Sequence, residues 1–425
     1  MFAGAPEQAQ APRPTPADGP LPTLAAGPLP TPAAGPLPTP AASGRRRVAI
    51  FAWETAQKDE EAPVAFYVRE SAAALQRAGD DVHVFTRDGA SAGDDGVSRH
   101  LCDTPWTGDA IAASTEFCNR AARAYLEEVS RGGPFQVVHG YGWRCGPAVR
   151  AAREVGVART IVTLHSTEYE RAGRLFTSGA SETVRRLEHN AAHEADRAIA
   201  VSEAVRRELL WVHGLPPEKV LVVHAGTGAP PTGPAPDAAA VKATHGVGAA
   251  DPLFVFIGDL SPEMGPDLLL SAVPVALRCA PKARFLFVGE GPLRQPLQER
   301  AARMGVGAAA RFLGHVTGNP LWRLLCASDA AVFPCRASKP LASVLYVWSA
   351  GKPVIVTHTG PSELVWHEVT GLKVYPFESS IVWGLERVVR DGAFARWMGR
   401  NGRTAVEEAF TWDAVARKLS RVYWG

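Results

Sequence analysis

Residues 327–376 read ASDAAVFPCRASKPLASVLYVWSAGKPVIVTHTGPSELVWHEVTGLKVYP and contain the pattern that decides the fold. Three short apolar runs, 330–333, 353–357 and 372–375, are strand candidates because each is short, apolar and bounded by turn-forming or polar residues. The stretch 340–350 between the first two has the length and apolar content of a buried helix. Strands that alternate with helices in this way are typical of parallel, doubly wound sheets.

The same alternation extends through the rest of the chain. We expect further strands at 48–53, 81–86, 136–139, 160–165, 198–202, 220–224, 253–257 and 284–288. We expect helices at 64–78, 182–195, 203–213, 267–278, 293–304, 394–410 and 412–423, with Ser202 capping the third of them. This pattern predicts an α/β protein with two doubly wound, Rossmann-like domains that face a cleft, where ligands bind at the strand ends.

Composition divides the chain into segments. The unit GPLPTPAA recurs from Gly27 to Ala34 and from Gly35 to Ala42, so residues 1–44 are predicted to be a disordered, partly polyproline-II tail. The other predicted segments are an N-terminal domain at 45–228, a Pro/Gly/Ala-rich linker at 229–252, a C-terminal domain at 253–405 and a closing helix at 406–425. For the closing helix, packing back onto the N-terminal domain is one option.

Several classes of function are disfavoured by the composition. The chain has 425 residues and a net charge of +2, which gives no basic field for nucleic acid. It contains no apolar run of about 18 residues, so we expect no integral membrane segment. No signal-peptide pattern opens the chain, and the six cysteines form no CxxC pair. We therefore expect a cytoplasmic protein without a metal site.

The order of several stretches resembles a known family. The second half contains IGDLSPEMGPDLLLSAVP (257–274), ARFLFVGEGPLRQPL (283–297) and the stretch quoted first, and these resemble the C-terminal domain of retaining family-4 (group 1 type) glycosyltransferases. VAIFAWE (48–54) and TIVTLHSTEYERAG (160–173) resemble the acceptor domain of the same family. The resemblance implies the GT-B fold and transfer of a sugar, with retention, from a nucleotide-sugar to a glycan or other acceptor. It implies no cofactor and no metal, because side-chain cations serve the diphosphate.

Many of the family's donor-binding positions carry other residue types. After the first strand of the second domain, the family has an Arg and a Lys, where this chain has Asp259 and Met264. The family's ribose-binding glutamate is replaced by Val347. Its glycine-rich loop is replaced by a stretch that contains Ala62 and Pro63. The other family glutamate has become Lys339, and the family's HAHDW stretch has become HGYGW at 139–143. Loss of two cations and the ribose carboxylate would weaken nucleotide binding by roughly 5 kcal/mol, or about a thousandfold.

Other family positions are retained. His165 matches the active-site histidine that contacts the donor sugar, although a strand-end histidine with a structural role is the alternative; Glu168 and Arg171 accompany it. By resemblance, the turn beside the nucleobase contains Gly289, Glu290 and Gly291. The loop at the donor phosphates contains, by the same resemblance, Gly360, Ser362 and Glu363. Arg336 and Lys339 are candidates for compensating cations. For Arg336, ordinary solvated surface charge is the favoured alternative, and Lys339 could equally be a relic position without pressure to keep a carboxylate.

Three functions remain compatible with these residues. The first is a working transferase with a rewired donor site, whose partners are a nucleotide-sugar and a glycan acceptor. The second is a catalytically inactive relative that binds a protein partner or acts in regulation. The third, hydrolysis or phosphorolysis on the same fold, has no positive signal in the sequence. The losses concentrate at the donor site while the strands and turns are kept, which indicates a fold maintained for a purpose.

Overall fold

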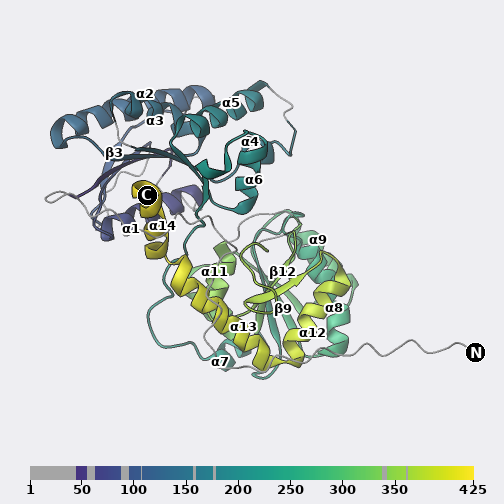
Figure 1. Cartoon of the computed structure of the whole chain (residues 1–425). Coiled ribbons are helices and arrows are strands. Elements are labelled where there is room, and N and C mark those ends of the chain that lie inside the picture. The colour runs from purple at the N-terminus through teal and green to yellow at the C-terminus, as the bar shows by residue number, and fades with distance from the viewer. Residues whose placement is uncertain are drawn as a thin grey trace, which may run out of the picture. The chain divides into compact units, whose positions relative to one another are not determined.

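The computed structural model describes residues 45–54, 63–87, 95–106, 108–156, 159–175, 179–336, 342–359 and 362–425. The predicted tail and the candidate positions Ala62, Lys339 and Gly360 lie outside these described residues. Two parallel sheets follow one another along the chain, and the predicted α/β architecture of two doubly wound domains is confirmed (Figure 1).

The first sheet has seven strands in the order β3-β2-β1-β4-β5-β6-β7. These are β1 (Arg47–Ala52), β2 (Asp81–Thr86), β3 (Ser98–Leu101), β4 (Val137–Tyr141), β5 (Arg159–Leu164), β6 (Arg197–Ala200) and β7 (Val220–Val222). All neighbouring strands run parallel, with Ala52 opposite Tyr141 at the end of β1 and β4. β1 reads as a continuous apolar run because helices cover both faces of a parallel sheet.

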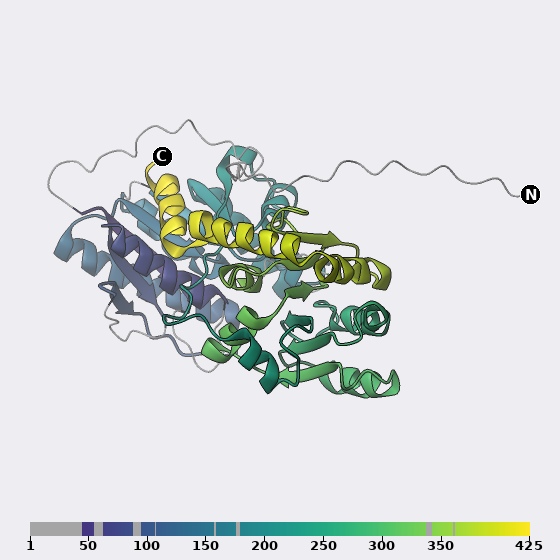
Figure 2. The same cartoon turned by 90° about the horizontal axis from the view of Figure 1, so that it is seen from below.

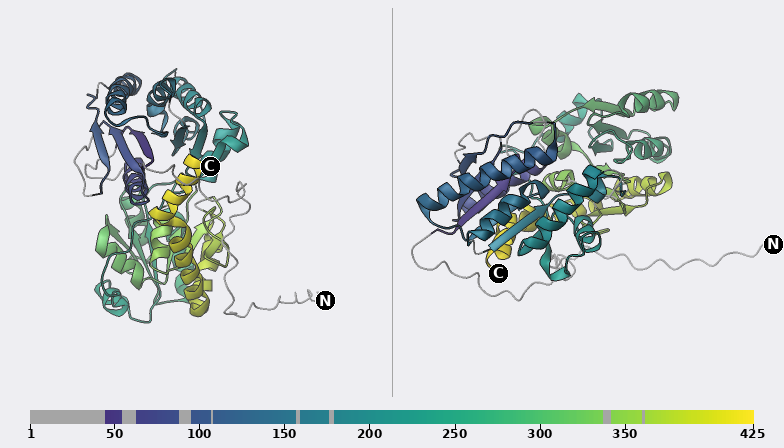
Figure 3. Two further views of the ribbon diagram at one scale, coloured as in Figure 1. Left: turned by 60° about the vertical axis from the view of Figure 1, so that its left-hand side comes forward. Right: turned by 90° about the horizontal axis from the view of Figure 1, so that it is seen from above.

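Alternate residues of β1 face the two helical layers. Ala49 and Phe51 pack in one cluster with α2 (Ala110–Gly132) and α3 (Gly146–Glu154), whereas Val48 and Ile50 pack with α1 (Pro63–Arg77) and α14 (Trp412–Trp424). Figure 1 shows α2 and α3 on one side of this sheet and α1 and α14 on the other, and Figure 3 shows the same layering from two further directions. The other helices of this domain are α4 (Glu168–Arg171), α5 (Gly179–Glu194) and α6 (Glu203–Trp211).

The second sheet has six parallel strands in the order β10-β9-β8-β11-β12-β13. They are β8 (Leu253–Ile257), β9 (Arg284–Val288), β10 (Ala310–Gly314), β11 (Ala330–Phe333), β12 (Val354–Thr357) and β13 (Gly371–Val374). The helices are α8 (Pro266–Cys279), α9 (Arg294–Arg303), α10 (Gly318–Ala327), α11 (Ala342–Ser349), α12 (Glu378–Arg390) and α13 (Gly392–Ala405). A single apolar core joins both faces of this sheet.

The last helix belongs to the core of the first domain, although it ends the chain. Val415, Leu419 and Tyr423 of α14 are buried in the same cluster as residues of β1 and α1. Figures 1 and 2 show α14 beside α1. The chain passes between the domains twice, and the two passages meet where the backbone N–H of Thr227 donates to the carbonyl of Phe410 over 2.8 Å.

Three differences separate the structure from the sequence-based expectations. The strands β3 and β10 were not predicted, and neither were the helices α2, α3, α4, α10 and α12. The expected linker at 229–252 is not irregular throughout, because Asp237 caps a helix, α7 (Ala238–Thr244), which packs on α10. Lys242 of α7 is buried and donates to Asp329 over 3.0 Å, which fixes the helix on the second domain. The predicted helix 394–410 ends as α13 at Ala405, and a π-helical turn follows.

None of the helices among the described residues has the length and apolar content needed to cross a lipid bilayer.

Candidate functional site

The strand order locates a ligand-binding edge in each sheet. In doubly wound sheets, ligands bind beyond the carboxyl ends of the strands at the point where the strand order reverses. In the first sheet this point lies between β1 and β4, and in the second between β8 and β11. The relevant residues therefore follow β1, β4 and β5 in the first domain, and β8, β9 and β11 in the second.

His165 directly follows β5 and is half-buried at this edge. Tyr67 contacts its ring edge-on, with centroids 5.0 Å apart, and Tyr141 lies 6.0 Å away. Both ring nitrogens are shielded from solvent and lack a hydrogen-bond partner among the described residues. Burial lowers the pKa of His165 to about 4, so the imidazole is neutral at pH 7. It can donate one hydrogen bond and accept another without adding charge to the site.

Next to His165, a layer of buried polar side chains is formed around His139 and Tyr141. His139 on β4 is fully buried, with Nδ1 2.7 Å from the Tyr423 hydroxyl and Nε2 2.7 Å from the Thr163 hydroxyl. Burial lowers the pKa of His139 to about 3. The Tyr141 hydroxyl, next in this layer, lies 3.2 Å from Ser71 Oγ. His139 is therefore a satisfied core residue, and its link to α14 ties the last helix to the sheet beneath the candidate site.

Arg171 and Glu168, which accompany His165 in the sequence, are engaged in internal contacts. Arg171 Nε donates to Glu168 Oε2 over 3.1 Å, and its Nη2 pairs with the fully buried Glu188. Glu188 also accepts the backbone N–H of Glu168 over 2.8 Å. Since these partners neutralise Arg171, it orders the loop after β5 rather than presenting a free cation.

Two residues of this edge were not identified as site residues from the sequence. Trp53 follows β1 and Arg144 lies after β4, on the two sides of the point where the strand order reverses. The guanidinium of Arg144 lies 5.3 Å from the centre of the Trp53 ring. No short pattern marks the pair, because 91 residues separate them; their adjacency follows only from the pairing of β1 with β4.

In the second domain, Gly289 and Gly291 allow two loops to approach closely. Both have positive φ angles, 137° and 149°. A Cβ atom on Gly289 would lie 2.0 Å from the carbonyl oxygen of Gly258, and one on Gly291 would lie 2.7 Å from that of Leu260. The turn after β9 therefore packs against the loop after β8. Glu290 between the two glycines forms an ion pair with Arg294.

The positions that depart from the family pattern do not form one cluster. Asp259 is exposed in the loop after β8 and has no ion pair with any residue that the structure describes. Met264 is 7% exposed, and its sulfur lies 4.0 Å from that of Cys335. Val347 on α11 is fully buried in the same core as Met264. Pro63 opens α1 in the first domain. Met264 and Val347 thus act as core residues, and neither offers a polar group to a ligand.

Arg336 lies after β11, at the expected edge, but it is already paired. Its Nη1 and Nη2 atoms contact the two carboxylate oxygens of Asp267, each over 2.7 Å, and Nη1 also donates to the carbonyl of Pro262 over 2.8 Å. A pocket of about 400 Å³ adjoins this pair, within the size range of small-molecule sites. Its lining is Pro262, Asp267, Leu293, Pro296, Leu297, Arg300 and Arg336.

The loop after β12 makes contacts with the first domain. Glu363 Oε2 accepts the backbone N–H of Glu203 over 3.1 Å, and Oε1 lies 3.2 Å from His224 Nε2. Ser362 donates to the carbonyl of His358 over 2.9 Å. Both predicted site residues of this loop therefore use their polar side chains within the protein.

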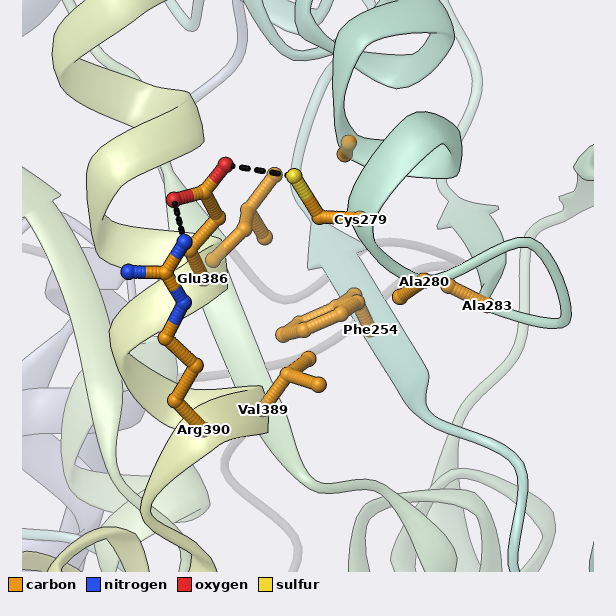
Figure 4. A pocket seen from close by; sticks show the side chains of 9 residues that line it. Phe254, Cys279, Ala280, Ala283, Glu386, Val389 and Arg390 are labelled. Carbon is orange, nitrogen blue, oxygen red and sulfur yellow. Dashed lines mark hydrogen bonds and ion pairs between the residues drawn. The ribbon is translucent and has the colours of Figure 1, made fainter.

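A second cavity, of about 40 Å³, lies at the opposite edge of the second sheet, near the start of β8 (Figure 4). Figure 4 shows the Cys279 thiol directed at Glu386, with a distance of 2.8 Å, and Arg390 on the other oxygen at 3.1 Å. A cavity of this size holds about one water molecule, so it is too small for a sugar or a nucleotide.

One group in the described part of the chain has the side chains of a metal site. The ligand atoms of His83, His100 and Glu128 lie within 4.8 Å of one another. His83 Nδ1 and His100 Nε2 are 2.9 Å apart, and Arg47 donates to Glu128 over 3.0 Å. Because the guanidinium already balances the carboxylate, the group is complete as a hydrogen-bonded cluster. It lies on β2, β3 and α2, away from the point where the strand order reverses.

Comparison with known proteins agrees with this geometry in both halves of the chain. A family described as glycosyl transferase 4-like domain matches residues 64–226, and one described as glycosyl transferases group 1 matches residues 251–391. The D-inositol 3-phosphate glycosyltransferase of Mycobacteroides abscessus is 29% identical over 380 residues, which cover 84% of this chain and 83% of the relative. A glycosyltransferase of Methanocaldococcus jannaschii, MJ1607, is 28% identical over 302 residues, covering 68% and 75%.

Solved structures with the same fold cover nearly the whole chain. Sucrose-phosphate synthase from Thermosynechococcus elongatus superimposes with a TM-score of 0.67 at 20% identity, covering 89% of this chain and 98% of that chain. Anabaena HepE in complex with UDP-glucose gives a TM-score of 0.65 at 17% identity, covering 88% and 98%. With both domain models in order and the GT-B fold in common with these structures, the chain carries the two domains of a glycosyltransferase, a glycosyl transferase 4-like domain followed by a glycosyl transferases group 1 domain.

Proposed function

We propose that the protein transfers a sugar from a nucleotide-sugar to an acceptor with retention of configuration, as the retaining family-4 enzymes do. The observation that carries the proposal is His165, a neutral imidazole with two unpartnered, shielded nitrogens at the carboxyl end of β5. Such a group is costly to keep without a ligand, because buried polar atoms are normally hydrogen-bonded. Structures with this fold contain UDP or UDP-glucose, which supports a nucleotide-sugar as the donor.

In the proposed reaction, the bond between the sugar C1 and a phosphate oxygen breaks, and a bond between C1 and the acceptor oxygen forms. The proton of the acceptor hydroxyl leaves with the nucleoside diphosphate. His165 would orient the donor by donating a hydrogen bond to a sugar hydroxyl. With a pKa of about 4 it is not a general acid at pH 7, so its contribution is positioning and polarity rather than proton transfer.

The donor site requires a source of positive charge for the diphosphate. Arg336 is suitably placed after β11, but a diphosphate would have to compete with Asp267 for it. The exposed carboxylate of Asp259 adds repulsion in the neighbouring loop. The proposed enzyme therefore binds its donor weakly in the free state, and gains affinity only if the donor displaces Asp267 from Arg336.

The alternative is a catalytically inactive relative that binds a protein partner. Three substitutions favour it: Met264 and Val347 fill the core where the family has charged groups, and Asp259 is an acid where the family has a cation. The two functions differ in one measurable property, because only the transferase must bind a nucleotide-sugar.

Calorimetric titration of the full chain with UDP-, GDP- and ADP-glucose tests the proposal, together with the release of nucleoside diphosphate during incubation with mixed acceptors. We expect one of the three donors to bind and to release its diphosphate. His165→Ala should lower the rate of release at least tenfold, while His315→Ala, an exposed histidine on the second domain, should leave it unchanged. Absence of binding for all three donors at millimolar concentration would refute the transferase and leave the inactive relative.

A further inference from the structure

Arg144 occupies a fixed position at the ligand-binding edge of the first domain. It lies in a short 3-10 turn (Trp143–Cys145) between β4 and α3, beside the point where the strand order reverses. Two side chains of α2, the hydroxyl of Ser114 and the thiol of Cys118, donate to its carbonyl oxygen, each over 3.0 Å. The backbone at Arg144 is therefore held from behind, and the side chain projects from a rigid support.

Two tryptophans hold the guanidinium of Arg144. Its central carbon lies 5.3 Å from the ring centre of Trp53 and 4.9 Å from that of Trp143. Trp53 is itself 7% exposed and packs edge-on against Phe117 of α2. Stacking of this kind fixes the plane of a guanidinium but supplies no hydrogen-bond acceptor.

Within the described part of the chain, the guanidinium of Arg144 is in no ion pair, although the carboxylate of Glu54 acts on it electrostatically. No ion pair or side-chain hydrogen bond involves its guanidinium there, and its Nε is shielded from solvent without an acceptor. By contrast, Arg171 in α4, which follows the neighbouring strand β5, forms ion pairs with Glu168 and Glu188. A half-buried charge that lacks a partner is unfavourable unless a ligand supplies one.

The surrounding charges favour an anion at this position. Burial lowers the pKa of Arg144 most, attraction by Glu54 raises it, and repulsion by Arg171 and Arg87 lowers it. The guanidinium stays charged nonetheless, because arginine does not lose its proton in proteins. The two ion pairs of Arg171 offset its charge, and Glu54 offsets part of the charge of Arg144. An oxyanion bound at Arg144 would offset the remaining charge through direct hydrogen bonds.

We propose that Arg144 is the anion-binding residue of the acceptor site, and that the acceptor therefore carries a phosphate or carboxylate group. The inference rests on the proposed function in that it takes the ligand of this edge to be the acceptor. The planar fork of arginine binds such oxyanions through two parallel hydrogen bonds, which also fixes the orientation of the ligand. A neutral sugar would leave the charge of Arg144 unmatched.

The test compares Arg144→Gln with a matched control, Arg150→Gln. Arg150 lies six residues further along, on α3, and its side chain is 52% exposed with a loose ion pair to Glu194 at 3.4 Å. Both changes remove one positive charge from the same segment, but only Arg144 is stacked at the sheet edge. Binding of inorganic phosphate, of glucose 6-phosphate and of glucose would be measured by calorimetry at constant ionic strength without any nucleotide.

We expect inorganic phosphate and glucose 6-phosphate to bind to the wild-type protein and to Arg150→Gln more tightly than glucose does. Loss of the charged hydrogen bonds in Arg144→Gln should weaken phosphate binding roughly 10- to 150-fold. Arg144→Lys, which keeps the charge but not the fork, should retain part of the affinity and guards against a folding defect in Arg144→Gln. Equal binding by Arg144→Gln and Arg150→Gln, or no phosphate binding at all, would overturn the proposal.

Two results would distinguish this proposal from an anion site for the donor and from the failure of the proposed transferase activity. If Arg144→Gln weakens UDP binding but leaves glucose 6-phosphate binding unchanged, the anion at Arg144 is the diphosphate of the donor, and the assignment to the acceptor is wrong. If Arg144→Gln loses glucose 6-phosphate binding but no nucleotide-sugar binds to the wild-type protein, the anion site stands and the proposed transferase activity fails. The two failures are therefore distinguishable.

Discussion

Arg336 and Asp267 face each other in a bidentate ion pair, with both guanidinium nitrogens 2.7 Å from a carboxylate oxygen. The pair connects the loop after β11 to the first turn of α8, on the edge where the second sheet would bind a ligand. An arginine held in this way is well oriented but already neutralised. The acid beside it therefore controls whether the cation is available to a diphosphate.

Asp267→Asn should raise the affinity for nucleoside diphosphates. The amide no longer competes as an anion for Arg336. We therefore expect UDP to bind roughly 10- to 150-fold more tightly, since a charge-assisted hydrogen bond contributes about 1.5–3 kcal/mol. Calorimetry measures the change. Asp413→Asn, which breaks the exposed pair with Arg77 at 2.8 Å, is the matched control and should have no effect. An unchanged affinity in Asp267→Asn would show that Arg336 does not serve the donor.

Asp259 and Met264 should respond differently to the restoration of a basic residue. Asp259→Arg changes an exposed side chain, so stability should shift by no more than about 0.5 kcal/mol, while UDP affinity rises. Met264→Lys would place an ammonium group in the core beside Cys335, and should destabilise the protein by about 3–5 kcal/mol. Urea unfolding of both variants tests this difference, and equal stabilities would contradict the burial of Met264.

The rate of transfer should depend on His165 without showing a histidine titration near neutral pH. Because burial lowers its pKa to about 4, the imidazole stays neutral from pH 6 to 8, and its contribution should be constant over that range. Below about pH 5 the ring begins to protonate, so its second nitrogen can no longer accept a hydrogen bond and a positive charge enters the site. The pH profile of diphosphate release measures this. A fall in rate centred near pH 6.5 that disappears in His165→Asn would mean that His165 titrates as an exposed histidine does.

Stability should decrease with acidification because His139 is buried in its neutral form. Its pKa is lowered from 6.5 in the ordinary state to about 3 in the folded protein, so between these values only the unfolded chain binds the proton. This contribution is fully present above pH 6.5 and is lost as the pH falls, with a slope of about 1.4 kcal/mol per pH unit. Urea unfolding from pH 7 to pH 4 measures it. His139→Gln should reduce the slope, whereas the exposed His315→Gln should not.

The closing helix should be essential for the first domain. Leu419 of α14 is fully buried in the cluster that includes β1 and α1, so Leu419→Ala should lower the free energy of unfolding by about 2–5 kcal/mol. Arg417→Ala, an exposed change two residues away, should have little effect and serves as the control. A loss of less than about 1 kcal/mol in Leu419→Ala would indicate that the helix is not a structural part of the domain.

The strands of both cores could be predicted because their residues form continuous apolar runs, as in FVFI of β8 or AVF of β11. β3 was missed because its sequence, SRHL, is polar and lies at the sheet edge, where one side is open. α7 was missed because its alanines lie in a Pro- and Gly-rich stretch that resembles a linker. The helix is stabilised by its packing on α10 and by the hydrogen bond from Lys242 to Asp329. The stability of these two elements comes from packing rather than from a local pattern.

By itself, the sequence determined that two parallel sheets form, where their strands lie and that His165 ends a strand, because hydrophobic periodicity and turn residues act over a few neighbouring positions. Only the tertiary structure decided that Asp267 neutralises Arg336, that Met264 fills a core and that the guanidinium of Arg144 lies against Trp53. These facts depend on which distant segments meet. These contacts follow from the pairing of parallel strands that are separated in sequence by whole helices. A local sequence pattern therefore does not predict them.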